Sequence, residues 1–503
     1  MIIDHRRLMM RASAVALAGH VAAACTIQPE ELSKAEFSRL ADSSIAGIAA
    51  DQQPVAGAID IHEAVARALK FNLDHQVELA DMAVRDRELQ LSHYSMLPSL
   101  VANSGYTGRD SYSASSSQNA LTGVESLATS TSQDKQVRTA DATFSWNILD
   151  FGLSYVRARQ AADKVLVQNE LRRKVALRIV EDTRTAYWRA VSAQRLLKRL
   201  HKVELQARDV EREARGLSTD KLSSPITSLT YEREIVEVQR TIGEVQRELN
   251  AAEVQLGTLM NIAPGTSFKL AGGKPGTPKM PRQKMSEVIH TAVMNRPELK
   301  EVAYRQRINE QEAHAALLEM LPGLNIYAAT SFDSNSFLLN NTWQGWGAKA
   351  TWNLLKVFSY PARSAVIEQQ DELLSKRALA VTMSIMTQVY VSRIKYAHAV
   401  KEFETAKRYS NVQQRLVAQI RAEAAADRVS RQTLVREELN SLVGEAKLDI
   451  AHAGMQSAHT FMMTSMGLTP DYATAIQGTV QEAAALLRQE VPTPLLTASV
   501  EGK

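Results

Sequence analysis

Histidines, paired carboxylates and a glycine-rich segment are the residues of this chain that could carry out catalysis, but none lies in a catalytic pattern. The eleven histidines are scattered, and the His-Glu-x-x-His zinc motif does not occur. The Gly-Gly-Lys run at 272–274 is followed by Pro275 and lacks the upstream glycine of a phosphate loop. Glu437 and Glu438 are interpreted as part of a solvated helix face. We therefore expect no enzyme activity, no cofactor and no metal; a net charge of +4 on a mixed surface favours no nucleic-acid partner.

The single cysteine, Cys25, stands in a context that predicts a different chemistry, the acylation of its thiol. Because it is alone, no intramolecular disulfide is possible. A basic segment, an apolar stretch at 12–21 and three alanines precede it, which is the layout of a secretory signal. Small residues ending in cysteine resemble the bacterial lipobox. We predict that residues 1–24 are a signal peptide and that Cys25 carries lipid such as palmitate. The alternative is an ordinary signal peptide with an incidental cysteine.

An internal duplication dictates how the elements of this chain must be arranged. Three segments recur with the same residue pattern: 96–98 as 320–322, 144–149 as 350–355, and 259–264 as 465–470. The repeated unit is far too long for a solenoid module. The sequence therefore predicts five parts after the signal peptide: an extended lead at 25–58, a first repeat at 59–264, a linker at 265–284, a second repeat at 285–470 and a tail at 471–503.

Each repeat contains a segment in which apolar and polar residues alternate. The segments 139–148 and 346–354 each present one apolar and one polar face over about ten residues, typical of membrane barrel strands. Their weaker partners are 99–108 and 323–332. A half-buried soluble hairpin would give the same alternation. Aromatic residues at the strand ends favour a membrane, because such girdles lie at membrane–water interfaces. These residues are Phe144, Trp146, Phe151, Trp352 and Phe358.

Very long helices are predicted after each hairpin. No proline or glycine occurs between Tyr155 and Arg215, a stretch that would span ~90 Å at ~1.5 Å per residue. The returning arm has a strict heptad seam, typical of coiled-coil pairing: Ile235, Val238, Ile242, Val245, Leu249, Ala252, Leu256 and Leu259. The arms are expected to turn near 216–225 and 422–431. Shorter amphipathic helices precede the hairpins, the second of them broken at Pro297. A cytosolic rod would explain the seam, but neither the signal segment nor the hairpins.

From Ile59 to Pro470 the chain resembles the TolC-like outer-membrane factor family. The segments that carry the resemblance are the Trp-Asn-Ile/Leu-Leu motifs at Trp146 and Trp352, the Asp-Phe-Gly run at 150–152, the segment 359–364, and the helix ends at 257–264 and 463–470. The resemblance implies a homotrimer in which each subunit gives four strands to one twelve-stranded barrel. It also implies a periplasmic tunnel of helical hairpins. The expected fold is therefore mainly α, with a membrane β-barrel continuous with a coiled-coil tunnel.

The strand count by itself also favours three subunits. Four strands cannot close a barrel, and an open edge in lipid would leave backbone groups unsatisfied. Two subunits would give eight strands, which enclose too narrow a lumen, whereas three would give twelve. No segment outside the signal peptide approaches ~18 consecutive apolar residues, so we expect strands to cross the membrane.

The resemblance implies an exit duct that conducts drugs or other small molecules passively out of the periplasm of a Gram-negative bacterium. Its expected partners are a periplasmic adaptor, an inner-membrane pump (a resistance-nodulation-division pump or an ABC exporter) and outer-membrane lipid. The alternative is a type I secretion duct for protein or polymer. A periplasmic coiled-coil adaptor is disfavoured, because the hairpins are doubled and no lipoyl-like domain is visible.

The family closes the periplasmic end of its tunnel with helix tips, which makes the charged residues near the two turns gate candidates. They are Arg421, Glu423, Asp427 and Arg428 at the second turn and Asp220 at the first. In a threefold assembly each becomes a ring of like charges, and charged rings set pore selectivity. The alternative is that they are solvated tip charges or adaptor contacts. Ala422 replaces the glycine found at 216 in the first repeat.

Overall fold

The computed structural model describes residues 30–489 except 49, 51, 56, 127, 220–224, 274–275, 279–282, 427 and 469–477. The predicted signal peptide and Cys25 therefore lie outside the described residues. The chain forms two compact units, Met1–Gln52 and Gln53–Lys503. Both repeats belong to the second unit, because helices of the first repeat pack directly on helices of the second.

The lead at 25–58 was expected to be extended, and this expectation is wrong for its central part. Helix α2 covers Lys34–Gly47 and none of its residues is buried. A capping box starts it: Ser33 accepts from the Glu36 backbone N–H at 3.2 Å, and Glu36 accepts from the Ser33 N–H at 2.9 Å. This serine–glutamate spacing was the sequence signal for the helix.

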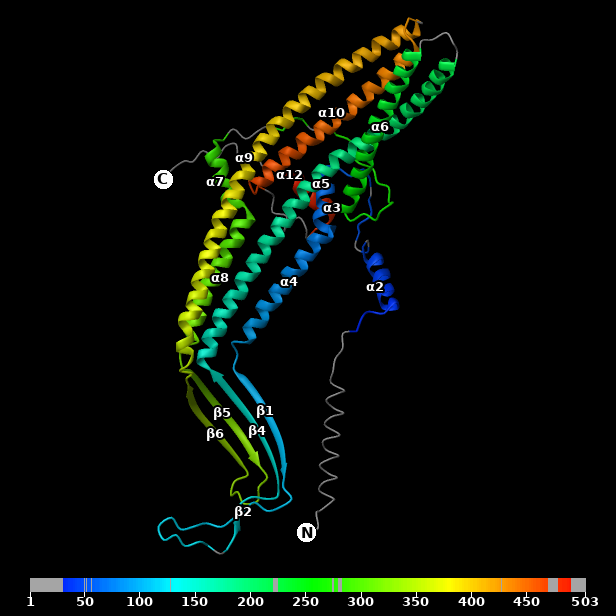
Figure 1. Cartoon of the computed structure of the whole chain (residues 1–503). Coiled ribbons are helices and arrows are strands. Elements are labelled where there is room, and N and C mark those ends of the chain that lie inside the picture. The colour runs from blue at the N-terminus through cyan, green and yellow to red at the C-terminus, as the bar shows by residue number, and fades with distance from the viewer. Residues whose placement is uncertain are drawn as a thin grey trace. The chain divides into compact units, whose positions relative to one another are not determined.

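The four predicted strands form one antiparallel sheet in the order β1-β4-β5-β6 (Figure 1). Their bounds are β1 Ser99–Gly108, β4 Gln136–Asn147, β5 Gly323–Asp333 and β6 Thr342–Thr351. The register places Leu100 opposite Phe144, Phe144 opposite Ala328, and Ala328 opposite Trp346. Because side chains alternate along a strand, this register gathers most of the apolar residues of the four strands on one face, although Val101, Tyr327 and Trp343 lie on the other. A small hairpin, β2 Ala114–Ser115 with β3 Ser130–Thr131, lies in the loop between β1 and β4.

Two strand ends differ from the prediction, and a pair of asparagines explains why. The segment 346–354 was expected to be strand throughout, but β6 ends at Thr351. The segment 139–148 was also expected to be strand throughout, but its last residue, Ile148, is the first residue of a helix. The Asn147 side-chain oxygen accepts from Leu149 N at 3.1 Å, and that of Asn353 accepts from Leu355 N at 3.2 Å. Asparagine satisfies free N–H groups at helix starts, so Asn147 ends β4 and starts α5. Asn353 instead lies in the short turn between β6 and α9, whose N-cap Leu355 has no side-chain cap.

Two long helical hairpins follow the strands. They are α5 Ile148–Thr219 with α6 Pro225–Leu259, and α9 Lys356–Ala425 with α10 Arg431–Ser465. The 72 residues of α5 span about 108 Å at 1.5 Å per residue. The predicted seam is confirmed where side chains are described: Ile242, Leu249 and Leu256 are no more than 1% exposed. Figure 1 shows the strands at one end of these helices and the hairpin turns at the other.

Shorter helices flank the long ones. They are α3 Ile61–Phe71 with α4 Leu73–Tyr94, α7 Met285–Asn295 with α8 Pro297–Leu318, and α12 Val480–Gln489. The break at Pro297 is confirmed, since this proline starts α8. The first repeat has an equivalent break at Asn72, whose side chain caps α4. In the tail, α12 packs on α3, and Arg488 pairs with Asp60. Among the helices that the structure describes, none is both long and apolar enough to cross a membrane.

Candidate gate region

The turn of the second hairpin is short and held by its own backbone. Helix α9 ends at Ala425, and the N–H groups of Ala426 and Arg428 both donate to the Glu423 carbonyl, at 3.1 and 3.0 Å. The Ser430 side chain accepts from Thr433 N at 3.3 Å and starts α10. The turn position near 422–431 is therefore confirmed, and replacement of glycine by Ala422 changes nothing there because residue 422 is helical.

The predicted gate residues have different surroundings within one chain. Arg421 pairs with Glu438 on α10, at 2.6 Å. The Glu423 carboxylate instead accepts from Gln419 on its own helix, at 3.0 Å. Arg428 is exposed, and its side chain forms no ion pair among the residues that the structure describes. Asp427 and Asp220 lie outside the described residues.

The paired carboxylates of α10 were interpreted as a solvated face, which the structure corrects. Glu437 accepts from Gln413 at 2.9 Å, and its side chain is 13% exposed. Glu438 is 21% exposed and pairs with Arg421. Both side chains therefore join α10 to α9, because the helices of the hairpin pack close enough to bring them opposite partners.

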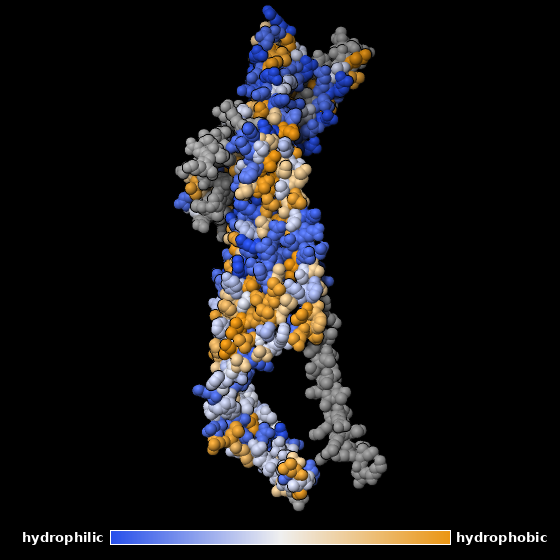
Figure 2. Space-filling model, turned by 90° about the vertical axis from the view of Figure 1, so that its left-hand side faces the viewer, coloured by the Kyte–Doolittle hydropathy of each residue, from blue (hydrophilic) through white to orange (hydrophobic). Residues whose placement is uncertain are grey.

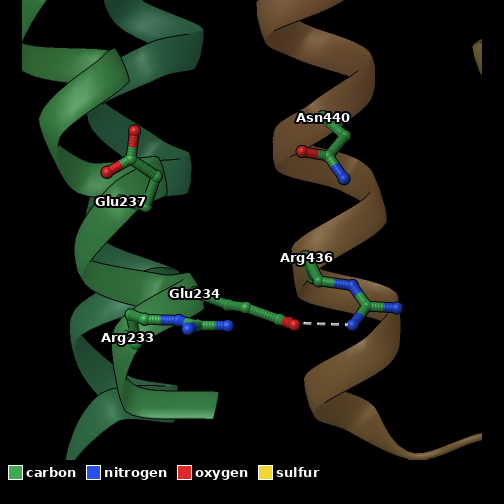
Figure 3. Close-up of a pocket in the computed structure, with 5 residues that line it drawn as sticks. All are labelled: Arg233, Glu234, Glu237, Arg436 and Asn440. Carbon is green, nitrogen blue, oxygen red and sulfur yellow. Dashed lines mark hydrogen bonds and ion pairs between the residues drawn. The ribbon is translucent and has the colours of Figure 1, made fainter. Parts of the chain in front are cut away.

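The sequence reasoning missed a contact that joins the two hairpins near their tips. Glu234 on α6 reaches across to Arg436 on α10, with 2.9 Å between carboxylate and guanidinium (Figure 3). This ion pair lies in a cavity of about 570 Å³ that Arg233, Glu237 and Asn440 also line. The hydrogen bond to Glu234 raises the pKa of Arg436 above its ordinary value. The pair is about one-third exposed on each side, so it is accessible to water.

Farther from the turns, a second set of ion pairs joins the same hairpins. Arg195 on α5 pairs with Asp449 on α10, and Arg199 pairs with Glu445, at 3.1 Å for one of its two contacts. The residues are four apart on each helix, so both pairs lie on one face. Beside them, a buried cluster of aliphatic side chains from α5, α6 and α10 forms the core between the hairpins. The four-residue spacing of these charges was visible in the sequence, but the helix that carries their partners was not.

The predicted interface aromatics are all partly exposed. Phe144, Trp146 and Phe151 are 42, 39 and 41% exposed, and the Trp146 and Phe151 rings meet edge to face at 5.8 Å. Trp352 is 54% exposed and donates from its ring nitrogen to the Met320 carbonyl at 2.9 Å. Phe358, on α9, is 80% exposed. Their place at a lipid interface stays a prediction.

Large apolar side chains are exposed along two helices of the second unit. On α4 they are Leu73, Val77, Val84, Leu91 and Tyr94; on α9 they are Val366, Leu373, Leu379, Met383 and Ile394. Figure 2 shows one face, on which apolar patches lie on the helices closer to the strands and the hairpin ends are largely hydrophilic. The sheet also has two edge strands, β1 and β6, each paired on one side only within the described residues.

Several solved outer-membrane channels have this fold. The chain matches the open state of the MtrE outer membrane channel of Neisseria gonorrhoeae with a TM-score of 0.63 and 14% identity, over 83% of this chain and 91% of that one. It matches the CmeC outer membrane channel of Campylobacter jejuni with a TM-score of 0.61 and 12% identity, over 92% and 98%. The outer membrane protein VceC of Vibrio cholerae matches with a TM-score of 0.58 and 9% identity, over 81% and 96%.

No family model matches the chain, and no curated protein matches it in sequence. The similarity to solved structures is therefore one of fold. The chain has the fold of these solved outer-membrane channels; it is mainly helical and contains one four-stranded sheet. The expected fold of the single chain is confirmed.

Proposed function

We propose that this protein is the outer-membrane exit duct of a tripartite efflux pump, through which small molecules pass passively from the periplasm to the exterior. The observation that carries the proposal is a four-stranded sheet with two open edges, joined directly to helices about 100 Å long. The solved channels of the same fold support the location in the outer membrane.

Three copies form the duct in this proposal. An edge strand in lipid must pair, because no water is present to satisfy its N–H and C=O groups. Strand β1 of one copy therefore pairs with β6 of the next, and three copies give twelve strands. The exposed apolar residues of α4 and α9 support contacts between copies, since contiguous apolar patches of this kind usually mark an interface.

The remaining parts of the proposal come from the resemblance to the family. A periplasmic adaptor and an inner-membrane pump supply the energy, and lipid on Cys25 anchors the start of the mature chain. The hairpin turns form the gate, where Arg421, Glu423, Asp427, Arg428 and Asp220 would become rings of charge. The pair between Glu234 and Arg436 supports this, because it joins the two hairpins close to the turns.

Two measurements test the proposed function. Native mass spectrometry of the detergent-solubilised protein should give three times the mass of the mature chain, which is the 55.5 kDa of the full sequence less residues 1–24 and plus the acyl groups. A deletion strain should become sensitive to dyes and detergents, and the wild-type gene should restore resistance. A monomer in detergent contradicts the duct. Unchanged sensitivity together with loss of a secreted protein would instead favour type I secretion.

A further inference from the structure

A second cavity lies between the two hairpins, away from the turns and from the strands. It has a volume of about 570 Å³ and is lined by α5, α9 and α10. Linker residues 272–273 and 276–277 form its fourth wall. The linker is anchored beside it, because Tyr396 donates to the Pro278 carbonyl and Gln456 donates to the Gly276 carbonyl at 3.3 Å. A volume of this size suits a small organic ligand.

One side of this cavity is aromatic. The rings of Trp188 and His452 meet edge to face at 5.5 Å, and those of His452 and Phe403 meet at 5.4 Å. Trp188 is 7% exposed, so its position is fixed by the core. Aromatic rings prefer edge-to-face or offset contacts with other rings. This wall therefore favours a ligand that carries an aromatic ring.

The other side of the cavity is cationic. Arg195 and Lys407 line it together with a single carboxylate, that of Asp449. Asp449 already pairs with Arg195, whereas Lys407 is exposed and has no ion pair among the described residues. The described residues of the lining therefore carry a net charge of +1, which favours an anion over a neutral molecule or a cation.

A buried hydroxyl lines the same cavity without a partner. Ser410 is 1% exposed, and its Oγ makes no hydrogen bond within the protein. Buried polar atoms are almost always hydrogen-bonded, so an unpaired one that lines a cavity is available to a water molecule or to a ligand in that cavity. Ser410 lies three residues after Lys407 on α9, so both side chains face the same side of the helix.

We propose that this cavity binds a small aromatic carboxylate. The ring packs against Trp188, His452 and Phe403, the carboxylate accepts from Lys407, and the Ser410 hydroxyl donates to it. The site depends on how one chain packs and not on whether the chain serves efflux. Absence of binding would therefore not contradict the proposed duct. Conversely, restored dye resistance does not test this site.

The test adds 4-fluorophenylacetate to the detergent-solubilised full chain. Binding is measured from the fluorine NMR signal of this probe. We expect saturable binding, and binding about tenfold weaker for 4-fluorophenylacetamide, which has the same ring and no charge. Lys407→Ala should weaken binding of the acid by about tenfold, and Ser410→Ala should weaken it by a smaller factor. Neither change is expected to prevent folding, since Lys407 is exposed and serine to alanine only removes an unpaired hydroxyl.

The matched control is Lys401→Ala, which removes the same charge from an exposed position of α9 outside the cavity. It should change the affinity less than about twofold, because distant exposed charges are screened. Three results would each overturn the proposal: no saturable binding below about 10 mM, equal affinity for acid and amide, or equal effects of Lys407→Ala and Lys401→Ala.

Discussion

Replacing Arg436 by alanine removes the ion pair with Glu234 and should favour the open state of the proposed trimeric duct. Each partner is about one-third exposed, so the pair contributes about 0.5 kcal/mol, as exposed ion pairs do. Three copies in a trimer contribute about 1.5 kcal/mol, which is roughly tenfold in the ratio of open to closed channels. The buried leucines between the hairpins contribute several times more, so the channel should loosen without unfolding.

The assay is the open probability of purified trimers in planar bilayers. The control is Arg208→Ala, because Arg208 pairs with Glu204 on its own helix, is 61% exposed, and forms no ion pair with a second helix among the described residues. It should leave the open probability unchanged. Because Arg436 also pairs with Glu437, the second variant is Glu234→Ala, which removes only the pair between the hairpins and should raise the open probability by a similar factor. The double variant Glu234→Ala with Arg436→Ala should add little to either single change. If both single variants behave like Arg208→Ala, the pair does not hold the hairpins together.

Three further changes test other parts of the structure. Leu442, on α10, is 3% exposed in the core between the hairpins, so Leu442→Ala should lower the free energy of unfolding by about 2–5 kcal/mol. Leu205→Ala, at 49% exposure, should cost less than about 1 kcal/mol, and equal melting temperatures for the two variants would contradict that core. Burial, and then Arg184, lowers the pKa of His459 to about 4, so stability should be full above the ordinary value of 6.5 and fall as pH drops from 6.5 toward 4. His459→Gln should flatten that profile in thermal melts, and an unchanged slope would show that another group titrates. Cys25→Ser should abolish palmitate labelling and lower the mass of the mature chain while trimers still form; retained label would place the acyl chain elsewhere.

The amino-acid sequence alone determined most of the elements, because periodicity is a local property of the backbone. Alternation with a period of two located all four strands, and the heptad spacing located α6 and the buried face of its seam. The duplication then required the second half to repeat the plan of the first. Helix α2 could also have been found, since its capping box lies in plain sequence at Ser33 and Glu36.

Tertiary structure alone decided which charges meet. Arg436 pairs with Glu234, and Arg195 pairs with Asp449, because α5 and α6 pack on α10 with one particular rotation about the helix axes and one register along them. No local pattern encodes that register between segments some 200 residues apart. The same holds for the aromatic cavity, whose walls come from three helices and the linker. Local spacing fixes the face on which a side chain lies, but its partner depends on the packing of distant segments.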